Sequence, residues 1–501
     1  MTWKRWRRMR QVVQVLVLVL YIYLLFAALQ RQAAFPLADL FFRLDPLAAL
    51  STMLAARAWI PRLAPALITL GLTLVLGRVW CGWLCPLGTL LEWVRFRPSR
   101  GLGDFGRLRV VKNLALLVIL AAALFGNLSL LILDPLALFT RTMTTVILPA
   151  FNYAITTVEI GLYPIPALRP LIDWLEGLLR GPVLPVAQPV FAQSALIAVL
   201  FAAILALNAL ADRFWCHYLC PLGALLGLLS KVSLLRPVVG VACNRCGHCT
   251  DACRLDAIES QRGYEIIAAE CTVCLDCLAA CPENRIGFRC RRRPDAIRET
   301  DPTRRQVLAA LAAGAVGVAV LRTGVRAKQM HPQLIRPPGA QDEKVFLSRC
   351  LRCSQCIKVC PTSGLQPALV KAGLEGLWTP YLAPRLGYCG YGCNACGLVC
   401  PSGAIPPLEL ARKQKQVLGL AAVDRNRCLP WAYGTPCIVC EEMCPTPEKA
   451  IRLEEVTTSY DQGEPVFVQR PYVLEDLCIG CGICEYQCPM EGEAAIRVYR
   501  G

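Results

Sequence analysis

Histidine, charged residues and several common cofactor signatures are scarce or missing in this chain of 501 residues. It has three histidines, too few for the paired ligands of a haem relay through a membrane. It contains no C-x-x-C-H haem attachment sequence, no G-x-x-x-x-G-K-S/T phosphate loop and no convincing dinucleotide fingerprint. These absences argue against haem-based and nucleotide-driven chemistry.

Charged side chains make up only 18% of the residues, whereas hydrophobic side chains make up 55%. This balance is too apolar for a soluble protein and predicts membrane spans, each needing about 20 apolar residues. Four runs are long enough, at about 11–29, 62–80, 112–133 and 194–212. Buried helices of a soluble protein are the alternative, which the continuously apolar first run disfavours.

The formal net charge is +17, and the basic residues gather beside the apolar runs. Segments 1–10 and 92–112 are rich in arginine and lysine, whereas the longer segment 135–193 has few. Because positively charged loops stay in the cytoplasm, the N-terminus and the 92–112 loop are predicted to be cytoplasmic. The charge therefore fits a membrane topology, and no nucleic-acid partner is expected.

A Cys-x3-Cys-Pro element occurs twice, as RVWCGWLCPLG at 78–88 and RFWCHYLCPLG at 213–223. The predicted topology places both elements at the cytoplasmic ends of the second and fourth spans. Their thiols suit a membrane-edge iron–sulfur site, a redox-active dithiol pair or a packing role at helix ends. His217 in the second element aligns with Gly82 in the first, which argues against an indispensable histidine ligand. The candidate cofactor-binding residues are Cys81, Cys85, Cys216 and Cys220.

The repeat extends to LDPLA, which contains Asp45 in the first half and Asp134 in the second. Both aspartates are expected near the periplasmic side. Asp before Pro is a favourable helix start, so an N-cap role is one interpretation. Proton handling at a quinol site is the other. The second half also carries an insertion at about 140–190, in which ALRPLIDWLEGLLR predicts an amphipathic surface helix.

Cysteine replaces the apolar signal after the fourth run. Residues 243–253 and 271–282 follow the C-x2-C-x2-C-x3-C spacing with which bacterial ferredoxins hold two 4Fe–4S cubes. In that arrangement the fourth cysteine of each motif ligates the other cube. Structural zinc is the alternative, but it does not need this spacing. The predicted sets are Cys243, Cys246, Cys249 and Cys281 for one cube, and Cys271, Cys274, Cys277 and Cys253 for the other. Arg254 stands where a proline usually follows, a difference that affects turn geometry and not a ligand.

Four more motifs follow in the C-terminal part and predict four further cubes. The second and third motifs are stretched in their first gap, which favours nested pairing: the outer two motifs form one ferredoxin unit around an inner, irregular one. Pairing of adjacent motifs is the alternative. The predicted metal ligands are Cys350, Cys353, Cys356 and Cys360; Cys389, Cys393, Cys396 and Cys400; Cys428, Cys437, Cys440 and Cys444; and Cys478, Cys481, Cys484 and Cys488. Cys290 is left over.

Between the two cysteine-rich regions, Arg304 and Arg305 precede a short Ala/Gly/Val run at 307–321. A twin arginine before such a run resembles a Tat export signal. An ordinary fifth span and a soluble linker helix are the alternatives. No strong small-residue cleavage site occurs near 322–330, so a retained anchor is favoured.

The predicted fold class is a polytopic α-helical membrane domain plus α+β bacterial-ferredoxin-like iron–sulfur domains. Four regions are expected: a membrane domain with four spans and both Cys-x3-Cys-Pro elements, a cytoplasmic ferredoxin domain with two cubes, a twin-arginine-like anchor (about 304–322) with a linker, and a periplasmic ferredoxin domain with four cubes. Their bounds are 1–235, 236–295, 296–345 and 346–501.

The predicted spans, CGWLCPLG, CHYLCPLG and the two-motif block resemble NapH-type membrane ferredoxins. The segment from TRRQVLAALAAGA onward, with its four motifs, resembles NapG/MauM-type exported ferredoxins. The chain looks like a fusion of two subunits that elsewhere cooperate. The resemblance implies electron transfer from membrane quinol, through clusters, to a periplasmic redox protein or cytochrome such as a nitrate-reductase-type enzyme of anaerobic respiration.

The resemblance and the motifs together imply six 4Fe–4S clusters, a further iron–sulfur site at the Cys-x3-Cys-Pro elements, and quinol as electron donor. Expected partners are membrane lipid, the quinone pool, a periplasmic redox protein and the Tat export machinery. The expected location is the bacterial inner membrane. No catalytic residue is predicted, and whether the chain itself oxidises quinol stays open. A redox-sensing or maturation factor for a periplasmic metalloenzyme is the alternative function.

Overall fold

The computed structural model describes residues 3–29, 37–94, 108–180, 184–185, 188–290, 301–323, 331–459 and 465–500. Most of the basic 92–112 loop and of the segment near 322–330 lies outside these residues. The chain forms two units, each described by itself below. Unit 1 comprises Met1–Leu25, Asp39–Thr142 and Leu196–Leu321, and unit 2 comprises Phe26–Ala38, Met143–Ala195 and Arg322–Gly501.

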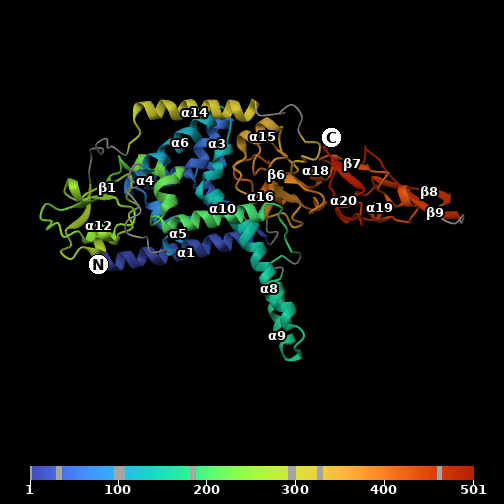
Figure 1. Ribbon diagram of the computed structural model, residues 1–501, viewed down its shortest axis with the longest axis horizontal. Helices are drawn as coiled ribbons and strands as arrows, with labels where there is room; N and C mark the ends of the chain where they lie inside the picture. The colour runs from blue at the N-terminus through green and yellow to red at the C-terminus, as the bar shows by residue number, and fades with distance from the viewer. Residues whose placement is uncertain are drawn as a thin grey trace. The chain divides into compact units, whose positions relative to one another are not determined.

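Unit 1 is built around the first helix of the second half, α6 (Arg109–Leu124), which packs against helices from both halves of the repeat (Figure 1). The other helices are α1 (Trp3–Leu29, mostly in this unit), α2 (Leu40–Arg43), α3 (Pro46–Ala56), α4 (Ala66–Leu76), α5 (Pro86–Trp93), α7 (Pro135–Thr142), α10 (Ser194–Ala206), α11 (Pro221–Ser230) and α14 (Arg304–Thr323). The short turns are η1 (Pro61–Leu63), η2 (Trp80–Leu84), η4 (Ser129–Leu133), η7 (Leu207–Ala209) and η8 (Trp215–Leu219).

Three helices in the described residues are long and apolar enough to cross a membrane: Trp3–Ala27, Pro135–Leu162 and Arg304–Leu321. The first and third coincide with the expected span at 11–29 and the expected anchor at about 304–322. The second lies largely in the insertion, where the sequence predicted no span. It runs through α7, the π-turn η5 (Met143–Ile147) and α8 (Leu148–Leu162).

The other three expected spans do not form single long helices. The run 62–80 is broken at Gly77, whose φ of 76° ends α4. The run 112–133 is broken because Gly126 has a φ of 77° and the Asn127 side chain accepts a hydrogen bond from Ser129 N. In the run 194–212, α10 ends at Ala206 and Asn208 donates to carbonyls near the end of α5. The lengths of the apolar runs alone therefore overestimated the lengths of these three helices.

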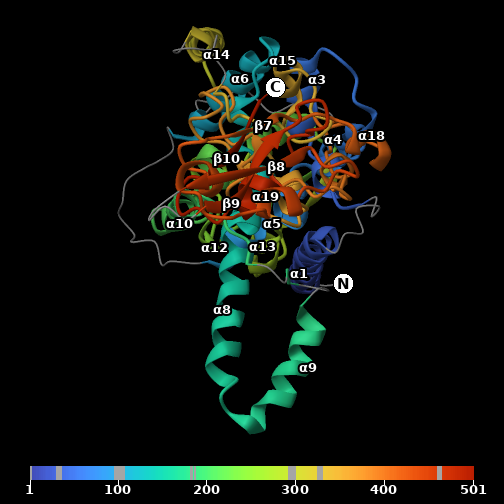
Figure 2. The ribbon, with the colours of Figure 1, turned by 90° about the vertical axis from the view of Figure 1, so that its right-hand side faces the viewer.

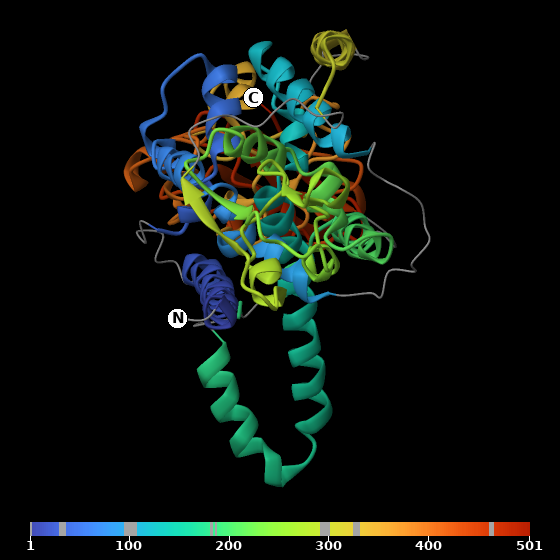
Figure 3. The ribbon, with the colours of Figure 1, turned by 90° about the vertical axis from the view of Figure 1, so that its left-hand side faces the viewer.

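The ferredoxin block of unit 1 follows α11 and is the yellow-green part that faces the viewer in Figure 3. Strands β1 (Leu235–Val239) and β4 (Ile286–Cys290) pair antiparallel, as do β2 (Ile258–Glu259) and β3 (Glu265–Ile266). The short turn η9 (Ser260–Arg262) joins β2 to β3. Helices α12 (His248–Ala252) and α13 (Asp276–Ala280) pack together over a small apolar core. This α+β arrangement is the expected one.

Unit 2 contains a helical hairpin made of α8 and α9 (Arg169–Leu179), which lie side by side in Figure 2. The turn η6 (Pro166–Leu168) lies between them. Arg180 joins the two helices, because its guanidinium contacts Glu159 at 2.5 Å and the Thr156 hydroxyl at 2.8 Å. Helix α9 is the expected amphipathic helix: Ile172 is buried, whereas Trp174 is 62% exposed.

The rest of unit 2 is a cysteine-rich α+β region of short elements (Figure 1). Its antiparallel strand pairs are β5 (Leu365–Pro367) with β6 (Pro380–Leu382), β7 (Leu420–Val423) with β10 (Ile496–Tyr499), and β8 (Ile451–Ser459) with β9 (Pro465–Val473). The helices are α15 (Glu343–Arg349), α16 (Gln355–Lys358), α17 (Ala395–Leu398), α18 (Leu410–Gln414), α19 (Val439–Glu442) and α20 (Ile483–Gln487), with the π-turn η10 (Leu429–Tyr433). Cysteine side chains form much of its core.

Candidate iron–sulfur and thiol sites

The two Cys-x3-Cys-Pro elements have the same local structure. In each, a π-turn ends at the second cysteine, which then becomes the N-cap of the next helix. The Cys85 sulfur accepts a hydrogen bond from Gly88 N at 3.4 Å, and the Cys220 sulfur accepts one from Gly223 N at 3.3 Å. Proline at the first helical position suits this start because it lacks the N–H that would have no partner.

Each element also receives an arginine from the other half of the repeat. Arg213 donates to Cys81 O at 2.9 Å, and a Cβ added to Gly88 would lie 2.8 Å from the Arg213 guanidinium. A Cβ added to Gly223 would lie equally close to the guanidinium of Arg78. Both arginines are at most 2% exposed. The conspicuous glycine of each CPLG sequence therefore leaves room for the opposite arginine.

The crossed arginines lie at a group of four thiols. Burial, followed by repulsion from Cys216 and Cys81, raises the pKa of Cys85. The same thiols, together with burial, raise the pKa of Cys220. All four cysteines of the two elements thus lie within electrostatic reach of one another. Buried thiolates need a nearby positive charge, which the arginines supply in part and a metal centre would complete.

The ferredoxin block gathers its cysteines as the motif spacing predicts. One cavity is lined by Cys243, Cys246, Cys249 and Cys281, and a second by Cys253, Cys271, Cys274 and Cys277. Burial raises the pKa of Cys271 to about 11 and that of Cys274 to about 12. Four thiols around one cavity, costly to ionise without a cation, fit a 4Fe–4S cube, which supplies one-electron chemistry when bound.

A cube also fits the spacing of the thiols better than a single zinc ion does. No three His, Cys, Asp or Glu side chains in the described ranges come close enough to hold one metal ion. A four-cysteine zinc site would bring its sulfurs to within about 2.3 Å of one point, whereas a cube holds them at separate corners.

The second cavity of the block lies against the first Cys-x3-Cys-Pro element. A Cβ added to Gly82 would lie 2.1 Å from Thr272 O, so only glycine permits this approach. Trp83 Nε1 donates to Val273 O at 3.0 Å. His217, which aligns with Gly82, is instead buried and stacked on Tyr218. Gly82 therefore permits the close approach of Thr272 to the first element, whereas the second element has a buried histidine at the matching position.

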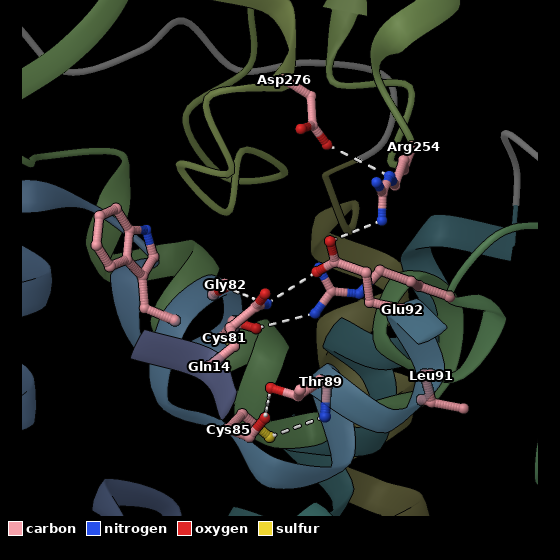
Figure 4. A network of polar contacts seen from close by, with 12 residues as sticks. Gln14, Cys81, Gly82, Cys85, Thr89, Leu91, Glu92, Arg254 and Asp276 are labelled. Carbon is pink, nitrogen blue, oxygen red and sulfur yellow. Dashed lines mark hydrogen bonds and ion pairs between the residues drawn. The ribbon is translucent and has the colours of Figure 1, made fainter. Parts of the chain in front are cut away.

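Glu92 on α5 joins α1 and α5 to the ferredoxin block (Figure 4). Its carboxylate accepts two hydrogen bonds from Arg10, at 2.8 and 2.9 Å, and one from Gln14 at 2.9 Å. Arg254, beside the predicted cube ligand Cys253, contacts Glu92 at 2.7 Å and Asp276 at 3.3 Å. The motif pattern links Arg254 to turn geometry only, whereas the structure shows that it forms this bridge.

The carboxylate of Glu92 is held ionised by these partners. Burial by itself would raise its pKa, but the hydrogen bonds of Arg10 and the charges of Arg213, Arg10 and Arg254 outweigh burial. The pKa of Glu92 is lowered to about 2. Sequence spacing could not have identified Glu92, because its partners come from three distant segments.

The four C-terminal motifs pair with their neighbours, so the expectation of nested pairing is wrong. One cavity is lined by Cys428, Cys437, Cys440 and Cys488, and another by Cys444, Cys478, Cys481 and Cys484. Likewise Cys400 acts electrostatically on Cys350, Cys353 and Cys356, and Cys360 acts on Cys389 and Cys396. The long gap of the third motif forms the π-turn η10, which absorbs the extra residues without changing the pairing.

Asp45 and Asp134 are both N-caps, and they also meet. Asp45 Oδ1 accepts from Leu47 N at 2.8 Å, and Asp134 Oδ2 accepts from Ala137 N at 2.8 Å. Burial raises the pKa of both carboxyls, and repulsion from Asp45 raises that of Asp134 further. The second oxygen of each is buried and has no hydrogen-bond partner among the described residues. Two buried carboxyls that interact in this way favour holding a proton, because ionising both would bring two negative charges together. Cys290, in contrast, is exposed at the end of β4.

The paired ferredoxin motifs and their cysteine-lined cavities define a class of protein, the ferredoxin-type iron–sulfur electron-transfer proteins. A family model described as a 4Fe-4S binding domain matches residues 59–103 and 192–241, which contain both Cys-x3-Cys-Pro elements. A second model with the same description matches residues 471–491, around the fourth C-terminal motif.

Two relatives specify the family. The ferredoxin-type protein NapG of Escherichia coli is 37% identical over 191 residues, which cover 38% of this chain and 78% of NapG. The methylamine utilization ferredoxin-type protein MauM of Methylorubrum extorquens is 35% identical over 206 residues, which cover 39% of this chain and 89% of MauM. The chain belongs to the NapG/MauM family of ferredoxin-type proteins. No solved structure matches it.

Proposed function

We propose that this protein relays electrons from membrane quinol, through six 4Fe–4S cubes, to a periplasmic redox partner such as a nitrate-reductase-type respiratory enzyme. In this proposal unit 1 corresponds to a NapH-type membrane ferredoxin fused to the NapG/MauM-type part. The observation that carries it is the meeting of the four Cys-x3-Cys-Pro thiols directly beside the second cavity of the ferredoxin block. A membrane-edge redox centre there would lie next to the cube ligands Cys271 and Cys274.

The residues around this junction keep the two sites close and dry. Arg78 donates to Ala269 O at 2.7 Å, and Lys112 contacts Glu270 at 2.5 Å, so the loop before Cys271 is anchored on the membrane-side helices. Arg78, Lys112 and Glu270 are each at most 5% exposed. Excluding water and fixing the distance favour electron transfer over side reactions of the reduced centre.

Oxidation of quinol to quinone releases two electrons and two protons, and iron–sulfur cubes accept only the electrons. We assign a proton-accepting role to the buried pair Asp45 and Asp134, since each leaves one buried carboxyl oxygen without a partner and the two lie at matching helix starts of both halves. Replacing both by Asn should slow reduction by quinol while leaving reduction by dithionite unchanged. Asp173→Asn, at an exposed position of α9, is the control. Equal quinol rates in the double variant and in the native chain would remove the pair from the pathway.

The relay is tested with the purified full chain in liposomes under anaerobic conditions. A reduced quinol should reduce the clusters, as followed by EPR spectroscopy. Cys81→Ser and Cys220→Ser should abolish this reduction but not reduction by dithionite, whereas Cys290→Ser, at the exposed unassigned thiol, should have no effect. If quinol leaves every cluster of the native chain oxidised, the relay is ruled out and a sensing or maturation role gains support.

A further inference from the structure

In the C-terminal part, the first and second motifs form one ferredoxin unit and the third and fourth motifs form another. These two ferredoxin units meet through predicted ligands of different cubes. Cys389 N donates to Cys481 O at 2.8 Å, and Leu418 N donates to Ile479 O at 3.0 Å. The contact is close, because a Cβ added to Gly480 would lie 2.3 Å from Gly419 O. Cys389 belongs to the second motif and Cys481 to the fourth. Electrons that pass between these two ferredoxin units of the C-terminal part therefore have a directly hydrogen-bonded backbone path at this junction.

A buried cation lies at the same junction. Lys413, on α18, is 2% exposed. Its ammonium donates to Gly390 O at 2.5 Å and to Tyr391 O at 3.3 Å, and it also hydrogen-bonds to the side chain of Cys389. Its charge acts on Cys481 as well. In the described part of the chain, no carboxylate lies within ion-pair distance of Lys413.

A buried ammonium without a counter-ion is costly, and carbonyl oxygens satisfy its hydrogen bonds without cancelling its charge. Among the described residues, the nearby groups that would carry negative charge are the cysteines of the second and fourth motifs, as thiolates bound to iron. A cube with four thiolates carries net negative charge, which increases by one on reduction. The positive charge of Lys413 is therefore offset by negative charge in the cluster-loaded protein, and most fully when the cubes are reduced.

We infer that Lys413 is a shared counter-ion of the two cubes at this junction and a positioning residue for electron transfer between the ferredoxin units. Hydrogen bonds to sulfur and local charge are the main controls of cluster potential. Lys413 thus makes the two cubes at this junction easier to reduce than they would be without its charge. An electron that enters either ferredoxin unit of the C-terminal part is therefore drawn to the junction. The inference rests on the proposed clusters but not on quinol as their donor.

The test is a potentiometric titration of the full-length, cluster-loaded protein, followed by EPR. Lys413→Met should shift the midpoint potentials of two cubes to more negative values and leave the others unchanged. Lys413→Arg, which keeps the charge, should restore the native potentials. Lys415→Met, two residues along at an exposed position, should change nothing. Dithionite and mediators serve as reductants, so the result does not depend on quinol activity.

An unchanged titration of Lys413→Met with full iron content would overturn the inference, as would an equal shift of all the cubes. If Lys413→Met lost two cubes and Lys413→Arg kept them, the counter-ion role would be supported. If both variants lost the same cubes, retention of these cubes would depend on the shape of the lysine side chain and not on its charge. That result would overturn the inference.

Discussion

Single residues explain how the ferredoxin block of unit 1 is held. Arg254 occupies the position where a proline usually follows the fourth cysteine, and it reaches from beside the predicted cube ligand Cys253 to Glu92 on α5. Glu92 is also the partner of Arg10 on α1. One carboxylate thus joins α1, α5 and the block. Removing it would take an acidic partner from Arg10, Arg213 and Arg254, with Asp276 left to offset Arg10 and Arg254.

Glu92→Gln should therefore destabilise the block by about 3 kcal/mol at neutral pH, the magnitude of a lost buried ion-pair partner. The pKa of Glu92 is lowered to about 2, so its contribution to stability is present above the ordinary carboxyl pKa and is lost as the pH falls toward 2. Unfolding of the native chain should show this acid-dependent loss, and the variant should not. Glu283→Gln, in an exposed pair with Arg285, should behave like the native chain. Equal stability of the native chain and Glu92→Gln at pH 7 would refute the argument.

Among the elements, the two π-turns have equal geometry but unequal neighbours. The first carries Gly82 against the block, and the second carries buried His217. The two halves therefore contact the ferredoxin block differently: the first half places Gly82 against Thr272 O, whereas Lys112 of the second half pairs with Glu270. Both halves contribute thiols.

Gly82→Ala should displace the block from the first Cys-x3-Cys-Pro element, because the new methyl group would overlap a backbone oxygen 2.1 Å away. Overpacking of this kind costs about 1–3 kcal/mol. Limited proteolysis should show faster cleavage between β1 and β4, and quinol-driven reduction should slow. Gly71→Ala, on α4 with open space around it, is the matched control. Native protection in Gly82→Ala would contradict the docking geometry.

The pairing of neighbouring motifs can be counted in iron. Cys444 and Cys481 line one cavity, so changing both to Ser should remove one cube, about 4 irons. Cys440 lines a different cavity, so Cys440→Ser with Cys444→Ser should remove about 8 irons. Nested pairing would instead give the larger loss for both double variants, which an iron assay of the purified proteins distinguishes.

At the scale of the whole molecule, the proposed membrane topology depends on α14. It begins at Arg304 and is one of three described helices able to cross a membrane. A reporter fused after residue 501 should be active only if the C-terminal part reaches the periplasm. Arg304→Lys with Arg305→Lys should block that activity if export follows the twin-arginine route. Unchanged activity would favour an ordinary span, and a reporter active only in the cytoplasm would disprove export.

The iron–sulfur character of the protein follows from the amino-acid sequence alone. Ligand spacing in a ferredoxin motif is local, so the spacing from Cys243 to Cys281 is enough to sort these cysteines into two sets. The repeated RVWCGWLCPLG and LDPLA sequences likewise predicted two related halves. Helix capping by Cys85, Cys220, Asp45 and Asp134 is also local, since each caps the backbone two or three residues ahead.

Features that depend on contacts between distant segments were settled by the tertiary fold. Nested and adjacent pairing use the same local spacing, and only the packing of α16 on α17 and of α19 on α20 distinguishes them. The lengths of the apolar helices depended on Gly77, Gly126 and Asn208, whose roles are not visible in hydropathy. Glu92, Lys413 and the contact of Asp45 with Asp134 became recognisable only because the fold brings together charges that lie far apart in the chain.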